Sequence, residues 1–460
     1  MFMIASGGPE TAQRGPKGRL MLLRFRVANH RSIRDTAEIS LVSSAFSGSR
    51  PADHDWMAVT TRVAGIYGAN ASGKSTVLEA LGFMIDAITH SATTWGSRSR
   101  FPHHPFTLDA DSRTQTSLYE IDFVLDGVRY TYGFESSATG IHMEWLFSYP
   151  TGRKRMLFER SGLSGEDMEF GRSLPGENVR IARLLRPTAL YLSTAVNSNH
   201  KSLDAVYRWI TQHMRYARYT EADRHARIMW ARNIMENEIV LSQAIGLLRF
   251  ADLGITGMVL DEEDLDDDIV SILKDSLEGL MGSESPSRSM PSLEEIIGEL
   301  KKKIRFTHSG ADPTGSFLLS LEEESSGTIA WLALGVPALM ALRHGDVMAI
   351  DELDASLHPR LAAALVGMFK DRELNPAGAQ LIFTSHETSL LGQMPGINLS
   401  KDEIWFTEKT AQGATELFSL AEFPVRPTDN FEKRYLQGRY GAVPMVSPEE
   451  LRTVVLREAQ

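Results

Sequence analysis

The sequence predicts an α/β fold: a mixed central sheet with an antiparallel β layer, plus a mainly helical insertion. The apolar strand Val63–Tyr67 runs directly into a glycine-containing turn and then a helical pattern. A second apolar run, Val347–Ile350, ends in Asp351 and Glu352, and unpaired carboxylates at a buried strand are costly without a bound partner. Alternating runs between positions 22 and 159 predict the antiparallel layer. A chain of 460 residues should fold into two or more lobes.

Composition excludes several classes of protein. The chain is 42% hydrophobic and 23% charged, which is ordinary for a soluble globular protein. It contains no cysteine, which excludes disulfides, cysteine zinc sites, cysteine nucleophiles and iron–sulfur clusters held by protein thiolates. This fits a reducing compartment, and we expect a cytoplasmic location. The net charge of −11 and isoelectric point of about 5.7 disfavour a general nucleic-acid binder, so such contact should be local or made by a partner.

The chain carries no pattern that predicts a membrane protein. Its longest apolar run, Thr328–Leu342, contains Gly335 and Pro337 and predicts a buried helix rather than a membrane span. Residues 1–20 have too weak an apolar stretch for a signal peptide. They are rich in glycine, proline and small polar residues, so we expect an N-terminal extension without stable structure.

The first third of the chain predicts the β layer. Leu22–Val27 and Thr36–Leu41 alternate apolar and polar residues and predict an antiparallel hairpin. Two alternating runs within residues 118–134 are joined by Asp126-Gly127, a strong hairpin signal. The following segments predict strands over residues 144–149 and 154–159, a loop over residues 161–180, and a core strand over Ala189–Ser193.

The turn after Val63–Tyr67 has the spacing of a phosphate-binding loop, G-x-x-x-x-G-K-[ST], in the required strand–loop–helix context. Its backbone N–H groups would surround phosphates, helped by the positive end of the helix. Lys74 should reach the β- and γ-phosphates, and the Ser75 hydroxyl should ligate Mg²⁺. The expected nucleotide-binding residues are Gly68, Ala69, Asn70, Ala71, Ser72, Gly73, Lys74, Ser75 and Thr76.

A second group of site residues is predicted between Glu324 and Pro359 and at the end of the next strand. Asp351 should hold the Mg²⁺ shell through water, and Glu352 should act as general base on the attacking water. Adjacent strand residues point to opposite faces, so the strand must end between them for both to reach the site. His386, after the strand Gln380–Thr384, should sense the γ-phosphate by hydrogen bonding.

A polar turn that opens a helix predicts a second phosphate site. Its residues are Ser325, Ser326 and Gly327, followed by Thr328. One chain's phosphate loop need not face its own second site. We therefore expect a homodimer or higher homo-oligomer, arranged head to tail, with each nucleotide held between two chains.

The middle of the chain, residues 200–305, predicts a mostly helical insertion. It carries a basic cluster that is either a solvated helix face or a surface for nucleic acid or a partner protein. The acidic run Asp261–Asp268 lacks calcium-loop spacing and predicts a solvated helix start. Residues 281–292 predict a low-complexity linker, and Leu293–Ile304 predicts an amphipathic helix. The basic cluster comprises Arg208, His213, Arg215, Arg218, Arg224, His225, Arg227 and Arg232.

Four ordered motifs together resemble the ABC-type ATPase superfamily, in the branch with RecF, SMC, Rad50 and the OLD proteins. They are G-A-N-A-S-G-K-S-T, S-S-G-T, V-M-A-I-D-E-L-D and F-T-S-H, and F-R-V-A-N-H-R-S-I and L-H-P also fit that branch. The C-terminal Y-L-Q-G-R-Y-G-A-V-P is similar to AAA15/AAA_21-type ATPases of bacterial defence loci, such as RloA, AbiL and AriA-like proteins. The resemblance covers both halves of the chain outside residues 1–20 and much of 200–305.

The resemblance implies an ABC-type P-loop ATPase head with a family role for each motif. It implies a Walker A motif at Gly68–Ser75, a signature at Ser325–Thr328, a Walker B motif at Val347–Asp351, the catalytic Glu352, a D-loop at Leu353–Ser356 and the switch residue His386.

Two features of the sequence depart from the family. The signature lacks the usual L-S-G-G-Q, and no glutamine stands out as a Q-loop, with Gln115 or the Pro105-Phe106 region as candidates. Arg31 either approaches the nucleotide, as in Rad50-like relatives, or is a structural hairpin arginine.

These motifs predict five segments. They are an N-terminal extension over 1–20, an N-terminal half of the head with Walker A over 21–199, the helical insertion over 200–305, a C-terminal half with signature, Walker B, D-loop and switch histidine over 306–425, and a tail over 426–460.

Three functions are compatible with the sequence. The first is an Mg-dependent ATPase switch in antiphage defence that controls a separate effector, such as a Toprim or RloB-like nuclease from the same operon. The second is a RecF/Rad50-like ATPase that acts on DNA directly, through the basic helices of the insertion. A transporter or translation-factor ATPase ranks last, because the chain has one Walker A and a large insertion.

Overall fold

The chain folds into two compact units. The computed structural model describes residues 20–251, 254–265, 270, 271, 274, 293–310, 316–392, 394, 396–426, 428–444 and 447–456. One unit comprises residues 220–337, and the larger unit comprises the described residues up to Tyr219 and from Ala338 onward. The predicted extension over residues 1–20, except Leu20, and the predicted linker over residues 281–292 lie outside the described residues.

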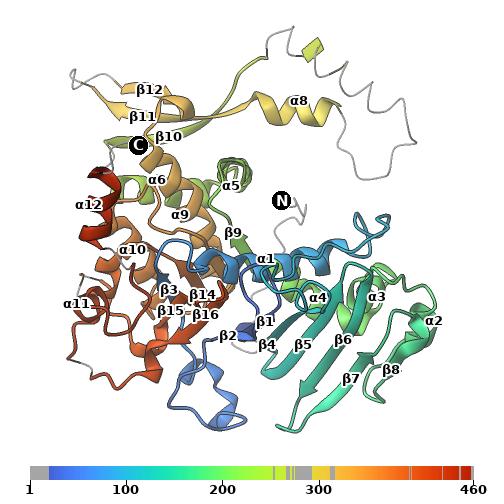
Figure 1. The fold of residues 1–460 in the computed structure, drawn as a ribbon. Helices are drawn as coiled ribbons and strands as arrows, with labels where there is room; N and C mark the ends of the chain where they lie inside the picture. The colour runs from blue at the N-terminus through green and yellow to red at the C-terminus, as the bar shows by residue number, and fades with distance from the viewer. Residues whose placement is uncertain are drawn as a thin grey trace. The chain divides into compact units, whose positions relative to one another are not determined.

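The larger unit contains a six-stranded sheet with the order β16-β15-β3-β14-β13-β9 (Figure 1). Five strands are parallel, and only β16 runs antiparallel to its neighbour. Because the carboxyl ends of parallel strands share one edge, the segments after β3, β13 and β14 meet there. The strands are β3 (Val63–Gly68), β9 (Met214–Ala217), β13 (Val347–Ile350), β14 (Gln380–Thr384), β15 (Ile404–Lys409) and β16 (Thr415–Ser419).

A seven-stranded antiparallel sheet forms the second layer of the larger unit, with the order β2-β1-β4-β5-β6-β7-β8. The hairpin turn at Asp126-Gly127 joins β4 to β5 as predicted, and β1 pairs with β2 as predicted. The strands are β1 (Met21–Ala28), β2 (Ala37–Ser40), β4 (Ser117–Leu125), β5 (Val128–Ser137), β6 (Gly140–Tyr149), β7 (Arg155–Arg160) and β8 (Met168–Phe170).

One apolar core joins the two sheets. Its side chains come from both sheets and from the helices α1 (Lys74–His90), α3 (Tyr191–Asn197) and α4 (Lys201–His213). Trp209 of α4 stacks on Phe123 of β4, with ring centroids 4.2 Å apart. The α/β fold class with a mixed central sheet and an antiparallel layer is therefore confirmed. The remaining helices of this unit are α2 (Asn178–Ala182), α10 (Pro359–Lys370), α11 (Phe431–Leu436) and α12 (Pro448–Leu456).

The smaller unit combines helices with a three-stranded antiparallel sheet of order β10-β11-β12. Its described elements are α5 (Glu221–Ile234), α6 (Glu238–Phe250), β10 (Ile255–Glu262), α8 (Leu293–Lys301), β11 (Lys302–Ser309), β12 (Ser316–Ser320) and the first part of α9 (Ser326–His344). Helix α9 is long and apolar enough to cross a membrane by length and composition, but 72% of its most apolar window is buried inside the protein. That burial is typical of a core helix.

The predicted core strand over Ala189–Ser193 is wrong, because Tyr191 begins helix α3. The cause is Glu144 of β6, whose side chain is fully buried. Its carboxylate accepts hydrogen bonds from the backbone N–H groups of Tyr191 (2.5 Å) and Leu192 (3.0 Å), so it satisfies the helix N-terminus from a distant strand. The predicted loop over residues 161–180 is also corrected, since it contains strand β8 paired with β7.

The acidic run at Asp261 is not a helix start. Asp261 and Glu262 end strand β10, where they lie opposite Lys303 and Lys302 of β11. Opposite charges at facing positions stabilise strand pairs, so Lys302 and Lys303 begin strand β11. Helix α8 therefore ends at Lys301 rather than at residue 304. Residues 266–268 of the run lie outside the described residues.

The predicted boundaries of the insertion differ from those of the smaller unit. Strand β9 pairs with β13 in the central sheet, so α4 and β9 belong to the larger unit and the division falls after Tyr219 rather than at residue 200. At the other side the smaller unit extends to Pro337 rather than to residue 305, because β11, β12 and the start of α9 are part of it. Its three-stranded sheet makes it less purely helical than expected.

Candidate functional site

The predicted phosphate loop connects β3 to α1 in a conformation that requires glycine. Gly68 has φ +156° and Gly73 has φ +106°. A Cβ atom would lie 2.5 Å from the Thr407 carbonyl oxygen at Gly68 and 2.1 Å from Thr415 Oγ1 at Gly73. Neither position could carry a side chain without displacing its neighbour. The loop can therefore lie against β15 and β16 because Gly68 and Gly73 have no side chain.

The side chain of Lys74 lies within this loop. It is 5% exposed, and its Nζ donates hydrogen bonds to the carbonyl oxygens of Gly68 (2.9 Å) and Ala69 (3.1 Å). Burial lowers the pKa of Lys74, while the negative charges of Glu352, Asp354 and Asp351 oppose that shift. A cation held within a phosphate-type loop can form strong charge-assisted hydrogen bonds to an anionic ligand.

Hydroxyl groups from other elements hold the loop in place. Ser72 Oγ lies 2.6 Å from Thr407 Oγ1, and Thr415 Oγ1 donates to the Ser72 carbonyl (2.9 Å). Ser32 Oγ lies 2.9 Å from Thr415 Oγ1 and 3.1 Å from Thr76 Oγ1. The sequence did not indicate Ser32, Thr407 or Thr415. Each is an ordinary hydroxyl residue far from the loop in the chain, and only the sheet order brings it near.

Asp351 and Glu352 follow directly after β13. Strand pairing ends at Ile350, and Glu352 has φ +52°, so the backbone turns between the two carboxylates as the prediction required. Thr384, the last residue of β14, links them. Its Oγ1 donates to Asp351 Oδ1 (2.7 Å) and accepts from the Glu352 N–H (2.7 Å). The sequence predicts Thr384 only as the end of a strand and gives it no role in the site.

The surroundings of Glu352 shift the pKa of its carboxylate. Its pKa is raised, first by burial and then by the charge of Asp351, while His386 and Lys74 act in the opposite direction. His386 follows β14, and its backbone N–H donates to Asp354 Oδ1 (3.2 Å). The structure thus brings Lys74, Asp351, Glu352 and His386 to one edge of the central sheet. A raised carboxylate pKa favours proton abstraction near neutral pH.

The protein residues at this edge fit an Mg-nucleotide. Among the described residues, no group of three or more His, Asp or Glu side chains is placed to hold a metal ion alone. Mg²⁺ sites of nucleotide enzymes need only one or two protein oxygens beside water and phosphates. Asp351 and the Ser75 hydroxyl supply such oxygens, and the N–H groups at the start of α1 supply donors for phosphate.

Arg31 is engaged by the protein itself. It has φ +50°, its N–H donates to the His104 carbonyl (2.6 Å), and its guanidinium pairs with Glu79 of α1 at 2.7 Å. This favours the structural reading of Arg31. Gln115 is exposed in the loop before β4, and its backbone carbonyl accepts from Asn29 Nδ2 (3.2 Å).

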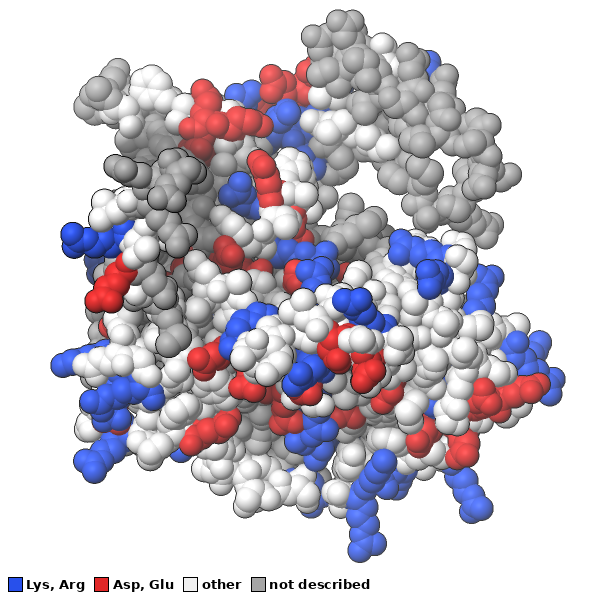
Figure 2. All heavy atoms as spheres, viewed as in Figure 1, with Lys and Arg blue, Asp and Glu red and all other residues white. Residues whose placement is uncertain are grey.

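Most cations of the predicted basic cluster are paired with acids. In the larger unit, Arg208 pairs with Asp204 at 2.8 Å, and Arg218 pairs with Asp86 at 3.0 Å. His213 and Arg215 share the buried Asp346. In the smaller unit, Arg227 pairs with Asp223, and Arg232 Nη1 donates to the Lys302 carbonyl (2.8 Å). On the face shown in Figure 2, basic and acidic side chains are interspersed. The pairing weighs against a surface of free cations, and Arg227 and Arg232 are buried rather than part of a solvated helix face.

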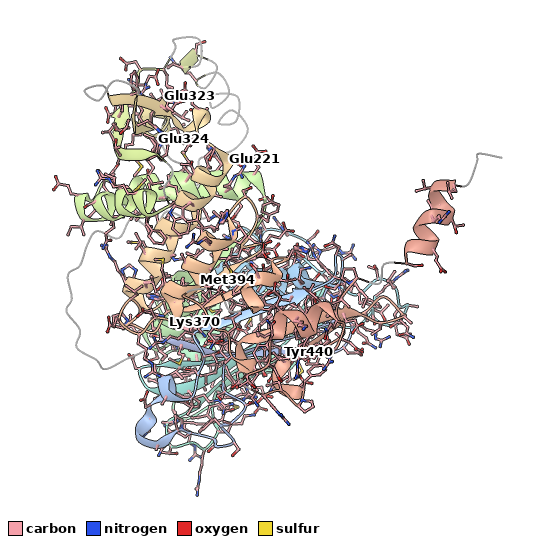
Figure 3. All side chains as sticks on the ribbon, turned by 90° about the vertical axis from the view of Figure 1, so that its left-hand side faces the viewer. Glu221, Glu323, Glu324, Lys370, Met394 and Tyr440 are labelled. Carbon is pink, nitrogen blue, oxygen red and sulfur yellow. The ribbon has the colours of Figure 1, made fainter. Side chains whose placement is uncertain are left out.

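The predicted second phosphate site lies at the start of α9, in the smaller unit (Figure 3). Ser325 Oγ accepts from the Thr328 N–H (3.1 Å), so this serine caps the helix. Ser326 is exposed, and Gly327 is half-buried. Glu324, just before the turn, pairs with His308 of β11 at 2.5 Å. These contacts fix the turn to β11 and leave Ser326 open to solvent.

Comparison with known proteins identifies the family. A family model described as "AAA domain, putative AbiEii toxin, Type IV TA system" matches residues 63–392, a span that includes Lys74, Ser326, Glu352 and His386. No curated protein matches the chain. Because the model covers more than half of the sequence, the chain belongs to this family. The predicted relationship to AAA_21-type ATPases is confirmed.

Solved structures match most of the chain at low sequence identity. An SMC head bound to the C-terminal winged-helix domain of ScpA is 13% identical, with a TM-score of 0.37, over 86% of this chain and 97% of that one. The SMC head domain from Thermotoga maritima is 12% identical, with a TM-score of 0.35, over 86% and 98%. An ATP-bound structure of the recombination mediator RecF is 12% identical, with a TM-score of 0.34, over 88% and 100%.

Proposed function

We propose that this member of the AAA family binds MgATP between two copies of the chain and hydrolyses it as a switch that controls a separate effector. The observation that carries the proposal is the convergence of Lys74, Asp351 and Glu352 at one sheet edge. Lys74 follows β3 and the two carboxylates follow β13, at the carboxyl ends of strands in one parallel sheet, and the charges of Asp351 and Glu352 raise the pKa of Lys74. An ammonium, a metal-type carboxylate and a base-type carboxylate around a phosphate loop are the parts that phosphoryl transfer needs.

Each residue has a distinct role in the proposed reaction. The loop N–H groups and Lys74 bind and orient the phosphates, and Ser75 and Asp351 would hold Mg²⁺. When bound, that ion would neutralise charge on the phosphate oxygens. Glu352 takes a proton from the attacking water, and its raised pKa makes it a stronger base. Thr384 orients both carboxylates through its hydroxyl. His386 senses the γ-phosphate.

The assembly is proposed to be a homodimer or a higher homo-oligomer. Ser325, Ser326 and Gly327 would bind the nucleotide of a neighbouring chain, for which the helix N-terminus of α9 offers positive charge. The exposure of Ser326 supports this, because a residue that serves a neighbour has to be accessible.

The effector is proposed to be a separate protein, such as a Toprim or RloB-like nuclease from the same operon in a cytoplasmic antiphage defence system. The C-terminal Y-L-Q-G-R-Y-G-A-V-P, which resembles that of ATPases from bacterial defence loci, supports this proposal. Stoichiometric co-purification of the native operon products would test this proposal, and isolation of the chain alone would contradict it.

Two substitutions test the catalytic assignment. Glu352→Gln should bind ATP and stall before hydrolysis, because the amide cannot accept the proton from water. Lys74→Ala should fail to bind ATP, because the loop loses its cation. ATP binding is measured by equilibrium dialysis and hydrolysis by phosphate release. Hydrolysis by Glu352→Gln at the wild-type rate would show that another residue is the base.

Direct action on DNA is the alternative function. The basic cluster is the feature that suggests this function. The ion pairs of Arg208, Arg218 and Arg227 weigh against it. Tight binding of duplex DNA by the isolated chain, with affinity that falls steeply as salt rises, would favour this alternative over an effector switch.

A further inference from the structure

The C-terminal tail folds back onto the central sheet through aromatic side chains. Its motif Y-L-Q-G-R-Y-G-A-V-P begins in helix α11, and no predicted site residue lies in it. Tyr435 stacks on Phe406 of β15, with ring centroids 5.3 Å apart and an interplanar angle of 10°. Tyr440 stacks on the same ring at 5.7 Å. All three side chains are buried, so this part of the tail is packed firmly against β15.

A buried hydrogen bond closes the motif into a loop. The Tyr435 hydroxyl donates to the Ala442 carbonyl oxygen at 3.0 Å. Near the end of the loop, Gly441 has φ +68°, and a Cβ there would lie 2.7 Å from Glu408 Oε2 of β15. The loop over residues 435–442, called here the tail loop, therefore meets β15 at both of its ends.

The tail loop and the phosphate loop lie on opposite faces of β15. Thr407 is opposite Gly68 in the parallel pairing, and its hydroxyl contacts Ser72 of the phosphate loop. Successive strand residues point to opposite faces of a sheet. Phe406 and Glu408 therefore lie on the other face, where the tail loop covers them. A shift of the tail loop would act on the strand that holds the phosphate loop.

The tail also contacts the segment that carries His386. Helix α11 packs against the short helical turn Thr388–Leu391, which begins two residues after His386. A Cβ at Gly392, directly after this turn, would lie 2.5 Å from Glu432 Oε2 of α11. Tyr435 belongs to α11 and stacks on β15, so it joins the support of His386 to the support of the phosphate loop.

We propose that α11 and the tail loop hold His386 in position relative to the phosphate loop, and that rapid hydrolysis requires this. The inference rests on the proposed ATPase function. A histidine that senses the γ-phosphate has to keep its distance from the loop that binds the phosphates, because a misplacement of about 1 Å can lower a rate about 100-fold. Tyr435 is a positioning residue, since it acts through α11 and Phe406.

The first test removes the hydrogen bond that closes the tail loop. Tyr435→Phe keeps the stacked ring and should lower kcat roughly 10-fold, while the Kd for ATP stays unchanged because the phosphate loop is intact. Tyr191→Phe is the matched control. It removes another buried hydroxyl, bonded to Asn178, and should keep the wild-type kcat. Phosphate release and equilibrium dialysis measure kcat and Kd, and circular dichroism shows whether the variants fold.

A double variant tests whether the tail acts through His386. In a His386→Ala background, Tyr435→Phe should lower kcat no further, because the side chain to be positioned is gone. Gly441→Ala is a second variant that should displace the tail loop from Glu408, and it should lower kcat at unchanged Kd in the otherwise wild-type chain. Losses that multiply in the double variant would mean that the tail only stabilises the fold, and would overturn the proposal.

The remaining outcomes separate the tail from the proposed function. Wild-type kcat in both Tyr435→Phe and Gly441→Ala, in a chain that hydrolyses ATP, would overturn the role of the tail alone. A loss of ATP affinity that accounts for the whole loss of activity would do the same. A wild-type chain without ATPase activity would overturn the proposed function and the role of the tail together, and a His386→Ala variant with wild-type kcat would remove the residue that the tail is proposed to position.

Discussion

The hydroxyl of Thr384 makes two hydrogen bonds that tie Asp351 and Glu352 together. Thr384→Val has nearly the same shape and removes both bonds. It should lower kcat roughly 10–100-fold, as losing a residue that orients a metal-site ligand typically does, while ATP affinity changes little. Steady-state kinetics and ATP binding measure the two effects, and Thr384→Ser should restore the rate. An unchanged kcat in the valine variant would mean that the carboxylates are oriented by other contacts.

The charge of Asp354 raises the pKa of both Glu352 and Lys74. Asp354→Asn removes that charge and keeps an oxygen that can accept the His386 N–H. Glu352 is active when deprotonated, so a lower pKa moves the acid limb of the pH–kcat profile to lower pH. Lys74 is active when protonated, so the basic limb moves the same way. Asp126→Asn, at a hairpin turn, should leave the profile unchanged. A profile that does not move in Asp354→Asn would contradict this coupling.

Strand ends in the central sheet are the elements that the sequence predicts best. β3, β13 and β14 are short, fully buried runs that end at the phosphate loop, at Asp351 and at Ser385, so their length and their flanks indicate both the strands and their ends. Helix α3 could not be found this way. Its N-terminus is satisfied by Glu144, a residue distant in sequence, and the apolar run alone fits strand or helix. The contacts of the Thr407 and Thr415 hydroxyls with the phosphate loop could not be predicted for the same reason, because their partners lie far away in the sequence.

Glu144 supplies the acceptor for two N–H groups of α3 and for the Tyr132 hydroxyl at 3.1 Å. Glu144→Ala leaves these donors buried and unsatisfied. The free energy of unfolding should fall by roughly 2–4 kcal/mol, which urea denaturation followed by circular dichroism would measure. Glu169→Ala removes an exposed carboxylate from the same sheet and should change stability by less than about 0.5 kcal/mol. Equal stability of the two variants would exclude Glu144 as the anchor of α3.

At the scale of the whole molecule, the sequence predicts that an insertion interrupts the nucleotide-binding core, but it puts the start at residue 200, whereas the smaller unit begins at Thr220. Strand β9 decides the boundary. Its four residues have no clear period, and they form a strand because they pair with β13 and because the Ala217 carbonyl accepts from the Asp351 N–H (2.9 Å). The edge of the insertion is thus set by long-range pairing next to the proposed catalytic carboxylates.

Head-to-tail assembly makes a specific prediction for the exposed Ser326. Ser326→Glu adds a negative charge at a helix N-terminus, which the helix itself favours but a bound phosphate opposes. In a Glu352→Gln background, ATP should still bind, but analytical ultracentrifugation should no longer detect ATP-dependent assembly. Ser326→Ala is the uncharged control and should still assemble.

A mixing experiment then separates action within one chain from action between chains. Ser326→Glu and Lys74→Ala chains should each lack ATPase activity alone. In a mixed pair, the intact phosphate loop of the Ser326→Glu chain faces the intact Ser326 of the Lys74→Ala chain, so one complete site forms. Phosphate release should therefore reappear on mixing and rise with the fraction of mixed pairs. If Ser326→Glu alone hydrolyses ATP at the wild-type rate, the turn before α9 does not serve a neighbour's nucleotide.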